Sequence, residues 1–278
     1  MKPGSLNFAG RILNLDRPLI MGVLNTTPDS FSDGGRWLDL GRALTHALDM
    51  VAAGADIIDI GGESTRPGSD PVSADEELSR VIPLLERLRV ESDVPVSVDT
   101  SKAQVMREAV RAGAGMINDV YALQSEGALA AAAELQVPVC LMHMGGSPRT
   151  MQLAPAYDDV VEAVTSFLRG RIVASEEAGV ASKAIVLDPG FGFGKTLQHN
   201  MELFQAIPRL CALGYPLLVG ISRKSMLGQI AGKPAQQRMP ASIVAAVLAA
   251  RQGAAILRVH DVGETADALK VAAALAPR

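Results

Sequence analysis

The chain has 278 residues, of which 48% are hydrophobic and 20% are charged, so it is long enough to bury one large core or two small ones. Its net charge of −4 includes no basic block, which argues against wholesale binding of nucleic acid or of a membrane surface and favours a small-molecule partner. The first residues carry no long apolar core and no later apolar run could span a bilayer, so we expect a cytoplasmic protein.

Short apolar runs alternate with helical patterns along the chain. Residues 5–16 alternate briefly between polar and apolar, which predicts a hairpin or cover before the first buried strand. Eight strand-like runs follow, at 20–24, 57–60, 94–98, 115–118, 137–142, 184–187, 216–221 and 255–259. Helical periodicity occurs at 38–53, 76–88, 103–111, 128–135, 160–178, 201–213, 242–251 and 264–275.

This alternation predicts a parallel sheet that is covered by helices. Eight units in about 250 residues fit a closed barrel better than a doubly wound sheet, which usually has fewer strands. The helix-to-strand turns are short and contain glycine, whereas the strand-to-helix loops 26–36, 61–73 and 143–156 are long. We therefore predict an α/β fold, a (β/α)8 TIM barrel, as a single domain over residues 1–278 with a short N-terminal cover segment and a functional face at the long loops.

Each predicted strand ends in polar side chains on that face. These are Asn25, Glu63, Asp99, Asn118 with Asp119, His143, Asp188, the run from Ser222 to Ser225, and the run from Arg258 to Asp261. One such residue is more often a turn or a helix cap, but eight strand ends that converge on one barrel mouth favour a binding site.

The seventh and eighth strand ends carry cations and hydroxyls. Arg258 and His260 are two apart on one strand and therefore point to the same side. With Ser222, Lys224 and Ser225 nearby, they predict a site for an anionic group, because barrels of this kind often bind phosphate there. The alternative for Lys224 is a solvated lysine at a helix start, although a cation there opposes the helix dipole.

Asp99, Asn118 and Asp188 come from strands three, four and six. Two acceptors and an amide suit a planar heterocycle with several N–H donors, and the same oxygen atoms could instead bind magnesium. Residues 188–196 superficially resemble a phosphate-binding loop, but Pro189 stands where that motif needs glycine. We expect its glycines to let the backbone approach a flat ligand, with Phe191 or Phe193 as an apolar wall and core packing as the alternative for one of them.

Eight stretches in family order, residues 24–35, 61–68, 97–102, 117–119, 141–144, 188–195, 222–225 and 258–261, together resemble the dihydropteroate synthase family. These are folate-pathway transferases that sulfonamides inhibit. The resemblance implies a (β/α)8 barrel, commonly a homodimer, with Mg2+ as cofactor. It also implies that the enzyme joins (7,8-dihydropterin-6-yl)methyl diphosphate to 4-aminobenzoate, which yields 7,8-dihydropteroate and diphosphate.

The resemblance also assigns roles to individual residues. Asp99, Asn118, Met142, Asp188 and Lys224 would hold the pterin, and Thr65, Arg66, Pro67, Phe193 and Ser225 would surround 4-aminobenzoate. Asn25, Arg258 and His260 would bind the diphosphate, Asn25 would also bind the metal, and Asp99, Lys224, Asp33 and Phe31 would take part in catalysis. The arylamine has a free lone pair and needs no dedicated base, so cleavage of the C–O bond could run ahead of its attack, inside a site that the long loops close to water.

Three alternatives share parts of this pattern. A related barrel that binds methyltetrahydrofolate would have no use for the diphosphate clamp of Asn25, Asp33, Arg258 and His260. A non-catalytic pterin-binding paralogue is disfavoured by the full set of polar strand ends, and a turnover assay would decide it. An aldolase with Lys224 as its Schiff-base amine is disfavoured because Lys224 follows its strand instead of lying inside the barrel.

Overall fold

The computed structural model describes residues 4–26, 36–64, 69–146, 151 and 155–276 of the chain. The barrel strands are β3 (Leu19–Asn25), β4 (Ile57–Gly61), β5 (Val96–Asp99), β6 (Met116–Asp119), β7 (Val139–Met142), β8 (Ile185–Asp188), β9 (Leu218–Val219) and β10 (Ile256–Val259). The helices between and after them are α1 (Arg36–Ala52), α2 (Ala74–Glu91), α3 (Ala103–Arg111), α4 (Ala128–Leu135), α5 (Val160–Glu177), α6 (Leu197–Gln205), α7 (Ile207–Cys211), α8 (Ser225–Ala231), α9 (Met239–Arg251) and α10 (Val262–Ala274), with single 3-10 turns at Ser182–Ala184 and Ala235–Gln237.

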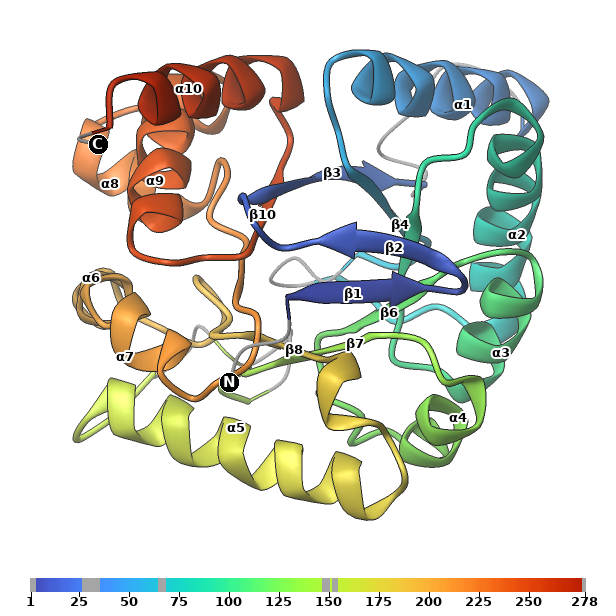
Figure 1. Ribbon diagram of the computed structural model, residues 1–278, viewed down its shortest axis with the longest axis horizontal. Helices are drawn as coiled ribbons and strands as arrows, with labels where there is room; N and C mark the ends of the chain where they lie inside the picture. The colour runs from blue at the N-terminus through green and yellow to red at the C-terminus, as the bar shows by residue number, and fades with distance from the viewer. Residues whose placement is uncertain (1–3, 27–35, 65–68, 147–150, 152–154, 277–278) are drawn as a thin grey trace.

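The eight strands are parallel and hydrogen-bonded in the order β8-β7-β6-β5-β4-β3-β10-β9, with the helices arranged around them (Figure 1). A parallel bridge between Leu187 and Leu217 joins the two ends of this order and closes the cylinder. The predicted (β/α)8 barrel is confirmed. The strands read as continuous apolar runs because the outward residues, such as Ile58 and Ile60, are fully buried in the hydrophobic cluster that the strands form with the helices.

Element boundaries follow the sequence with three exceptions. The predicted helix 201–213 is two helices, α6 and α7, and Pro208 stands in the first turn of the second, where its missing N–H is not needed. The predicted strand 216–221 is only two residues long as β9, so the closing seam between β8 and β9 is the shortest pairing in the barrel. Five residues separate that strand from helix α8; a helix start at Lys224 was considered from the sequence, but the span of this helix was not predicted.

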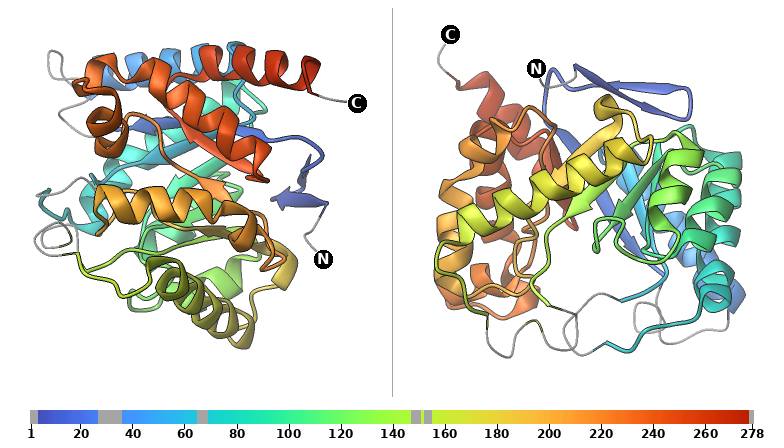
Figure 2. Two further views of the ribbon diagram at one scale, coloured as in Figure 1. Left: turned by 90° about the vertical axis from the view of Figure 1, so that its left-hand side faces the viewer. Right: turned by 90° about the horizontal axis from the view of Figure 1, so that it is seen from below.

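An N-terminal hairpin closes the end of the barrel at which the strands begin (Figure 2). Strands β1 (Ser5–Phe8) and β2 (Arg11–Asn14) pair antiparallel, which confirms the predicted hairpin. Leu6 and Phe8 are 1% and 2% exposed and pack on the lowest inward side chains of the barrel, which include Met21, Ile57, Met116, Cys140, Val186, Leu218 and Ile256. The base of the barrel is therefore an apolar plug.

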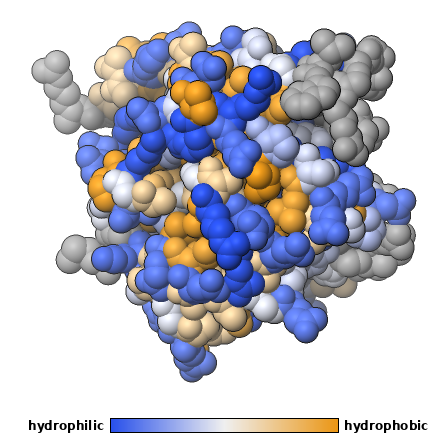
Figure 3. Space-filling view, turned by 90° about the vertical axis from the view of Figure 1, so that its right-hand side faces the viewer, coloured by the Kyte–Doolittle hydropathy of each residue, from blue (hydrophilic) through white to orange (hydrophobic). Residues whose placement is uncertain are grey.

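The surface differs between sides of the molecule. The side that carries α2 and α3 presents mainly hydrophilic side chains, with hydrophobic ones scattered among them (Figure 3). Large apolar side chains are exposed on α8, α9 and α10, namely Ile230, Val244, Leu248 and Val271. Within the described residues no helix is both long enough and apolar enough to cross a membrane.

Candidate active site

A buried cluster of charged side chains stands in the barrel interior above the apolar plug. Arg258 of β10 donates from Nε to Asp59 Oδ2 at 2.6 Å and from Nη2 to Asp99 Oδ2 at 2.8 Å. Asn118 donates from Nδ2 to the same Asp59 oxygen at 3.1 Å. Asp59 is 0% exposed and Asp99 9% exposed. One guanidinium thus links β4, β5 and β10 across the interior, and the amide adds β6.

The charges in this cluster are not balanced by the protein alone. Burial raises the pKa of Asp99 to about 7, while Arg258 opposes that shift and Asp59 adds to it. Burial lowers the pKa of Arg258, but Asp59 and Asp99 outweigh it, so the net shift is upward and the guanidinium stays charged. Asp59 Oδ1 is buried and has no hydrogen-bond partner among the described residues. A ligand with N–H donors would complete this cluster.

Asp188 and Lys224 form the opposite part of the wall, at the ends of β8 and β9. Asp188 is 6% exposed, its Oδ1 accepts a hydrogen bond from the Gly190 N–H at 2.7 Å, and Met142 is its register partner on β7. Burial raises the pKa of Asp188, against the effect of Lys224. Burial lowers the pKa of Lys224 to about 8, against the effect of Asp188. Each of the two groups therefore opposes the effect of burial on the pKa of the other.

Lys224 is placed by the turn that begins α8. It is the N-cap residue of that helix, its Nζ donates to the Phe191 carbonyl, and the same ammonium lies 4.5 Å from the centroid of the Phe193 ring. Phe191 is fully buried and packs against Phe204, whereas Phe193 is half-buried beside the ammonium. The alternative of core packing thus holds for Phe191, and Phe193 is the aromatic wall.

The loop at residues 189–196 is held from beneath by a buried lysine. Lys195 Nζ donates to the Gly190 carbonyl at 2.8 Å and to the Phe193 carbonyl at 3.0 Å, and it lies 3.0 Å from His143 Nδ1. Burial, followed by Lys195, lowers the pKa of His143 to about 3, so the imidazole is a neutral acceptor. A Cβ at Gly190, whose φ is +69°, would lie 1.8 Å from the His143 carbonyl oxygen, so only glycine fits.

Asn25 ends β3 beside Gly61, where the absence of a side chain leaves room next to the Asn25 amide oxygen and the Asp99 side chain. Asn25 pairs in register with Gly61 on β4, which in turn pairs with Asp99 on β5. A Cβ at Gly61 would lie 3.6 Å from Asn25 Oδ1 and 3.4 Å from Asp99 Cβ. The missing side chain leaves a space between an amide oxygen and a carboxylate. Oxygen donors are what Mg2+ prefers, so these residues fit that ion.

The eighth strand end carries an oriented histidine. His260 Nδ1 lies 3.0 Å from Ser222 Oγ, and the His260 N–H donates to the same oxygen at 3.2 Å. The next cation along the seventh strand end, Arg223, turns away and donates from Nε to Asp261 Oδ2 at 3.0 Å. Ser225 is exposed at the first position of α8.

Residues 21–260 match the family of proteins described as pterin binding enzymes, a range that spans every described mouth residue from Asn25 to His260. Over 262 residues the chain is 52% identical to the dihydropteroate synthase of Escherichia coli strain K12. The matched residues cover 94% of this chain and 93% of that relative. The chain belongs to the dihydropteroate synthase family. The predicted family and enzyme class, a transferase, are confirmed.

Solved structures of the dihydropteroate synthase family have the same fold. A Xanthomonas albilineans dihydropteroate synthase with 4-aminobenzoic acid superposes with a TM-score of 0.93 at 53% identity, over 99% of this chain and 100% of that chain. A Yersinia pestis dihydropteroate synthase in complex with a sulfonamide drug gives a TM-score of 0.92 at 52% identity, over 97% of this chain and 98% of that chain.

The fold brings together five residues that the family resemblance assigned to pterin, namely Asp99, Asn118, Met142, Asp188 and Lys224, and adds Arg258 to the same interior. The predicted residues Phe31, Asp33, Thr65, Arg66 and Pro67 lie outside the described residues. The side chains of His143 and Asp119 instead stabilise the backbone of nearby loops. His143 supports the loop at 189–196, and the Asp119 carboxylate accepts from the N–H groups of Tyr121 and Leu123 at 2.8 and 2.7 Å.

Asp59 is the residue of this dihydropteroate synthase fold that the sequence analysis missed. It lies within the predicted strand 57–60 and not at its end, so the search for polar strand ends passed over it. A signal was present, because a charge inside a strand that is buried on both faces requires a buried partner. The partner is Arg258, 199 positions away in the sequence, a separation that local patterns do not reveal.

Proposed function

We propose that this chain forms 7,8-dihydropteroate and diphosphate from (7,8-dihydropterin-6-yl)methyl diphosphate and 4-aminobenzoate. The observation that carries the proposal is the buried cluster of Arg258, Asp59, Asp99 and Asn118 in the mouth of a barrel that shares 52% identity with a dihydropteroate synthase. One buried carboxylate oxygen of this cluster, Asp59 Oδ1, has no donor among the described residues, and a pterin ring carries N–H donors.

The pterin lies flat over this cluster in our proposal. Asp188 and Asp99 accept hydrogen bonds from ring N–H and amino groups, while Asn118 and Lys224 donate to ring acceptors. Met142 contacts the apolar face of the ring from β7. The Lys195 clamp keeps the loop at 189–196 in place, so the positions of Asp188 and Phe193 are fixed before the ligand arrives.

The diphosphate group lies toward Asn25, Arg258 and His260. Arg258 uses two of its five N–H donors on carboxylates, which leaves donors for phosphate oxygens. Ser222 holds the His260 ring in one orientation. Asn25 would hold Mg2+ at the gap beside Gly61, and the ion, when bound, would neutralise charge on the diphosphate.

The 4-aminobenzoate site is proposed beside Phe193 and Ser225, with Thr65, Arg66 and Pro67 on the second long loop. We expect Ser225→Ala to raise KM for 4-aminobenzoate severalfold with little change in KM for the pterin substrate. Equal effects on both substrates would mean that Ser225 supports the fold instead. The Yersinia pestis relative was solved with a sulfonamide drug, and we propose that sulfonamides compete at this second site.

We propose that the C–O bond to diphosphate breaks before the amine attacks. The departing electron pair goes to the diphosphate oxygen, near Arg258 and His260, and the carbon gains positive charge near Asp99. The amine nitrogen then forms the new bond and loses a proton. With pterin diphosphate and Mg2+ but no amine, an oxygen-18 label should scramble from the bridging to the non-bridging oxygens of the attached phosphate, more slowly in Asp99→Asn. No scrambling, together with a rate that follows the nucleophilicity of substituted anilines, would show direct displacement.

The activity itself is tested by incubating the protein with pterin diphosphate, 4-aminobenzoate and Mg2+ and detecting dihydropteroate by mass. The native chain should form product, and Arg258→Met should form none above background. Binding of both substrates without turnover would identify a non-catalytic pterin-binding protein and overturn the proposal.

We also propose a homodimer that forms through α8, α9 and α10. The support is the set of apolar side chains that these helices expose: Ile230, Val244, Leu248 and Val271 are between 47% and 59% exposed. Val90 of α2 is exposed too, but the side over α2 and α3 is mainly hydrophilic (Figure 3). Light scattering after size exclusion should give twice the chain mass for the native protein and the monomer mass for Leu248→Glu. A native monomer would refute this part.

A further inference from the structure

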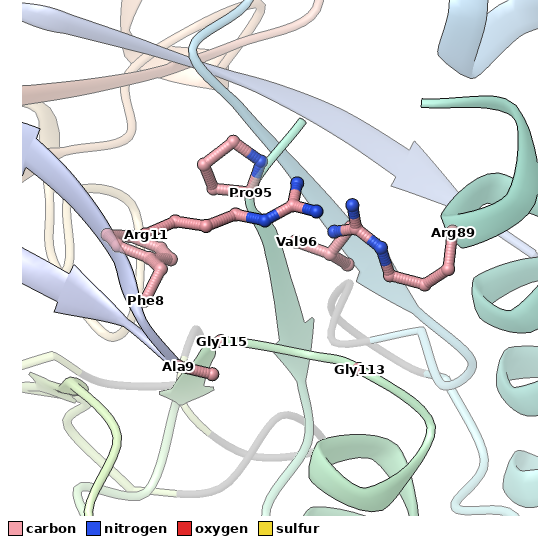
Figure 4. Close-up of a pocket in the computed structure, with 8 residues that line it drawn as sticks. All are labelled: Phe8, Ala9, Arg11, Arg89, Pro95, Val96, Gly113 and Gly115. Atoms are coloured by element: carbon pink, nitrogen blue, oxygen red, sulfur yellow. The ribbon is translucent and has the colours of Figure 1, made fainter. Parts of the chain in front are cut away.

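A second cavity lies at the opposite end of the barrel from the proposed substrate site. It has a volume of about 200 Å³ and lies between the N-terminal hairpin, α2 and the start of β5 (Figure 4). Arg11 of β2 and Arg89 of α2 enter it from opposite sides, and their guanidinium groups point toward each other. A Cβ at Gly113, also in the wall, would lie 2.8 Å from Arg89 Cδ, so a glycine there makes room for the arginine stem.

Positive charge exceeds negative charge in this cavity. Arg11 Nη1 is buried and has no hydrogen-bond partner within the described part of the chain. Arg89 Nη1 and Nη2 donate to the carbonyls of Val94 and Ser92 at 2.8 and 2.7 Å, which holds the guanidinium just beyond the end of α2. Burial, followed by repulsion from Arg11, lowers the pKa of Arg89.

Asp93 is the carboxylate that pairs with these two arginines. It bonds to Arg11, and the same oxygen is 3.9 Å from Arg89 Nη2. Its side chain is 98% exposed, so water screens the pairing from outside the cavity. Two cations that share one solvated carboxylate leave a net positive charge and a buried donor without an acceptor.

We propose that this cavity binds a small oxyanion of the phosphate or carboxylate class between Arg11 and Arg89. Planar guanidinium groups bind such ions through paired N–H donors, and the free Arg11 Nη1 supplies the first of them. The cavity of about 200 Å³ is large enough, because a water molecule occupies about 30 Å³ and a phosphate ion displaces only a few. The Asp93 carboxylate competes with the anion for the Arg11 guanidinium, and the anion replaces it there.

The bound anion joins three parts of the base. Arg11 belongs to the hairpin, Arg89 to α2, and Val96 in the cavity wall is the first residue of β5. Because the anion binds only where these parts meet, it stabilises the folded chain over the unfolded one. The anion therefore stabilises the contact of the N-terminal hairpin with α2 and the base of the barrel.

The test follows thermal unfolding against inorganic phosphate, with sodium chloride at matched ionic strength, in four proteins: the native chain, Arg11→Gln, Asp93→Asn and Arg17→Gln. The control residue Arg17 is an exposed arginine that also pairs with a carboxylate, that of Asp56, at 2.9 Å. Phosphate bound at the mouth of the barrel contributes equally to all four. We compare the affinity for phosphate with that of the native chain. It should be unchanged in Arg17→Gln, about tenfold weaker in Arg11→Gln and severalfold tighter in Asp93→Asn.

A second measurement does not depend on any variant being stable. In the native chain with 15N-labelled arginine, phosphate should shift the side-chain Nε signals of Arg11 and Arg89 saturably, and leave that of Arg17 in place. Acetate in a parallel titration separates the carboxylate class from the phosphate class. Identical phosphate responses in Arg11→Gln and the native chain, weaker binding in Asp93→Asn, or unmoved Arg11 and Arg89 signals would each overturn the proposal.

Discussion

The two layers inside this barrel are made by the same strands and have opposite chemistry. At the base, inward residues such as Met116, Cys140 and Val186 are fully buried apolar side chains beneath Leu6 and Phe8. Two positions further along the same three strands, the inward residues are Asn118, Met142 and Asp188. The alternation of inward residues that places the apolar plug therefore also places these three residues of the proposed pterin site.

This comparison separates stability from function. Apolar contacts at the base stabilise the fold without any requirement for directed partners. The mouth holds one arginine between two carboxylates, an arrangement whose desolvation cost can exceed its attraction, and which leaves an acceptor for a ligand. Substitutions at the base should therefore change unfolding, and substitutions at the mouth should change binding.

The largest effect is expected for Arg258→Met, which should change both stability and activity although Arg258 lies at the mouth. Asp59 and Asp99 would be left buried without their cation, which should lower the free energy of unfolding by about 3–5 kcal/mol at neutral pH and abolish turnover. Urea unfolding and the product assay measure both. Arg209→Met is the matched control, because its ion pair with Glu162 is exposed on both sides, 56% on the arginine and 49% on the carboxylate. That control should cost less than about 1 kcal/mol.

Phe8→Ala should affect stability alone. Loss of the buried ring from the plug should lower the free energy of unfolding by about 3–5 kcal/mol, because a cavity remains where the ring packed. Both KM values should be unchanged in the folded protein. Ile12→Ala, on the same hairpin and 59% exposed, is the control and should unfold like the native chain. A change in KM on Phe8→Ala would show that the two layers are not separate.

Asp188→Asn should affect binding alone. The amide presents N–H donors where the carboxylate accepts from the pterin, so pterin affinity should fall about tenfold to a hundredfold, the equivalent of 1.5–3 kcal/mol. Calorimetric titration of the folded variant provides the value. Asp119→Asn is the contrasting control, since Asp119 caps backbone N–H groups and should lower stability while pterin affinity is retained. Native affinity in Asp188→Asn would remove Asp188 from the site.

The last effect is a gradual one, in the pH dependence of stability. The pKa of Asp99 is raised from 3.8 to about 7 on folding, so between these values the native state binds a proton that the unfolded state has lost. Native stability relative to Asp99→Asn should therefore fall as pH rises from about 4 to about 7 and be constant on either side of this window. Urea unfolding at several pH values measures it, and a difference that does not vary with pH would show that Asp99 is ionised throughout.

The sequence predicted the architecture well because the barrel repeats one local signal. Each strand is a short apolar run that ends at a polar residue, and helices 103–111 and 128–135 were placed to the residue. The strand at 216–221 was predicted too long because apolar composition alone cannot show where ladder pairing stops. A helix start at Lys224 was considered, but the span of α8 was not predicted, since its seven residues, which include Gly228, carry too little periodicity.

The sequence predicted which residues lie together in the barrel interior, but not which of them contact one another. Strand-end position correctly brought Asp99, Asn118, Asp188, Lys224 and Arg258 into one interior. Which of them touch one another depends on the register of distant strands, so the Arg258 contact with Asp59 and the Lys195 contact with His143 became visible only in three dimensions. Residues 27–35 and 65–68, on the first two long loops, lie outside the described part of the chain, and the roles predicted for them stay predictions.

The pairing between β8 and β9 is the shortest in the barrel, so we expect these two strands to separate at the lowest free-energy cost. Leu187 meets the next strand through a single bridge to Leu217 and one hydrogen bond to the Pro216 carbonyl at 2.9 Å, whereas every other neighbouring pair in the barrel has at least two residue pairs in register. Amide hydrogen exchange by local opening should therefore be fastest along this line. Asp188 follows Leu187 on one side of this seam and Lys224 follows β9 on the other, so we expect local opening there to change the distance between these two charged groups.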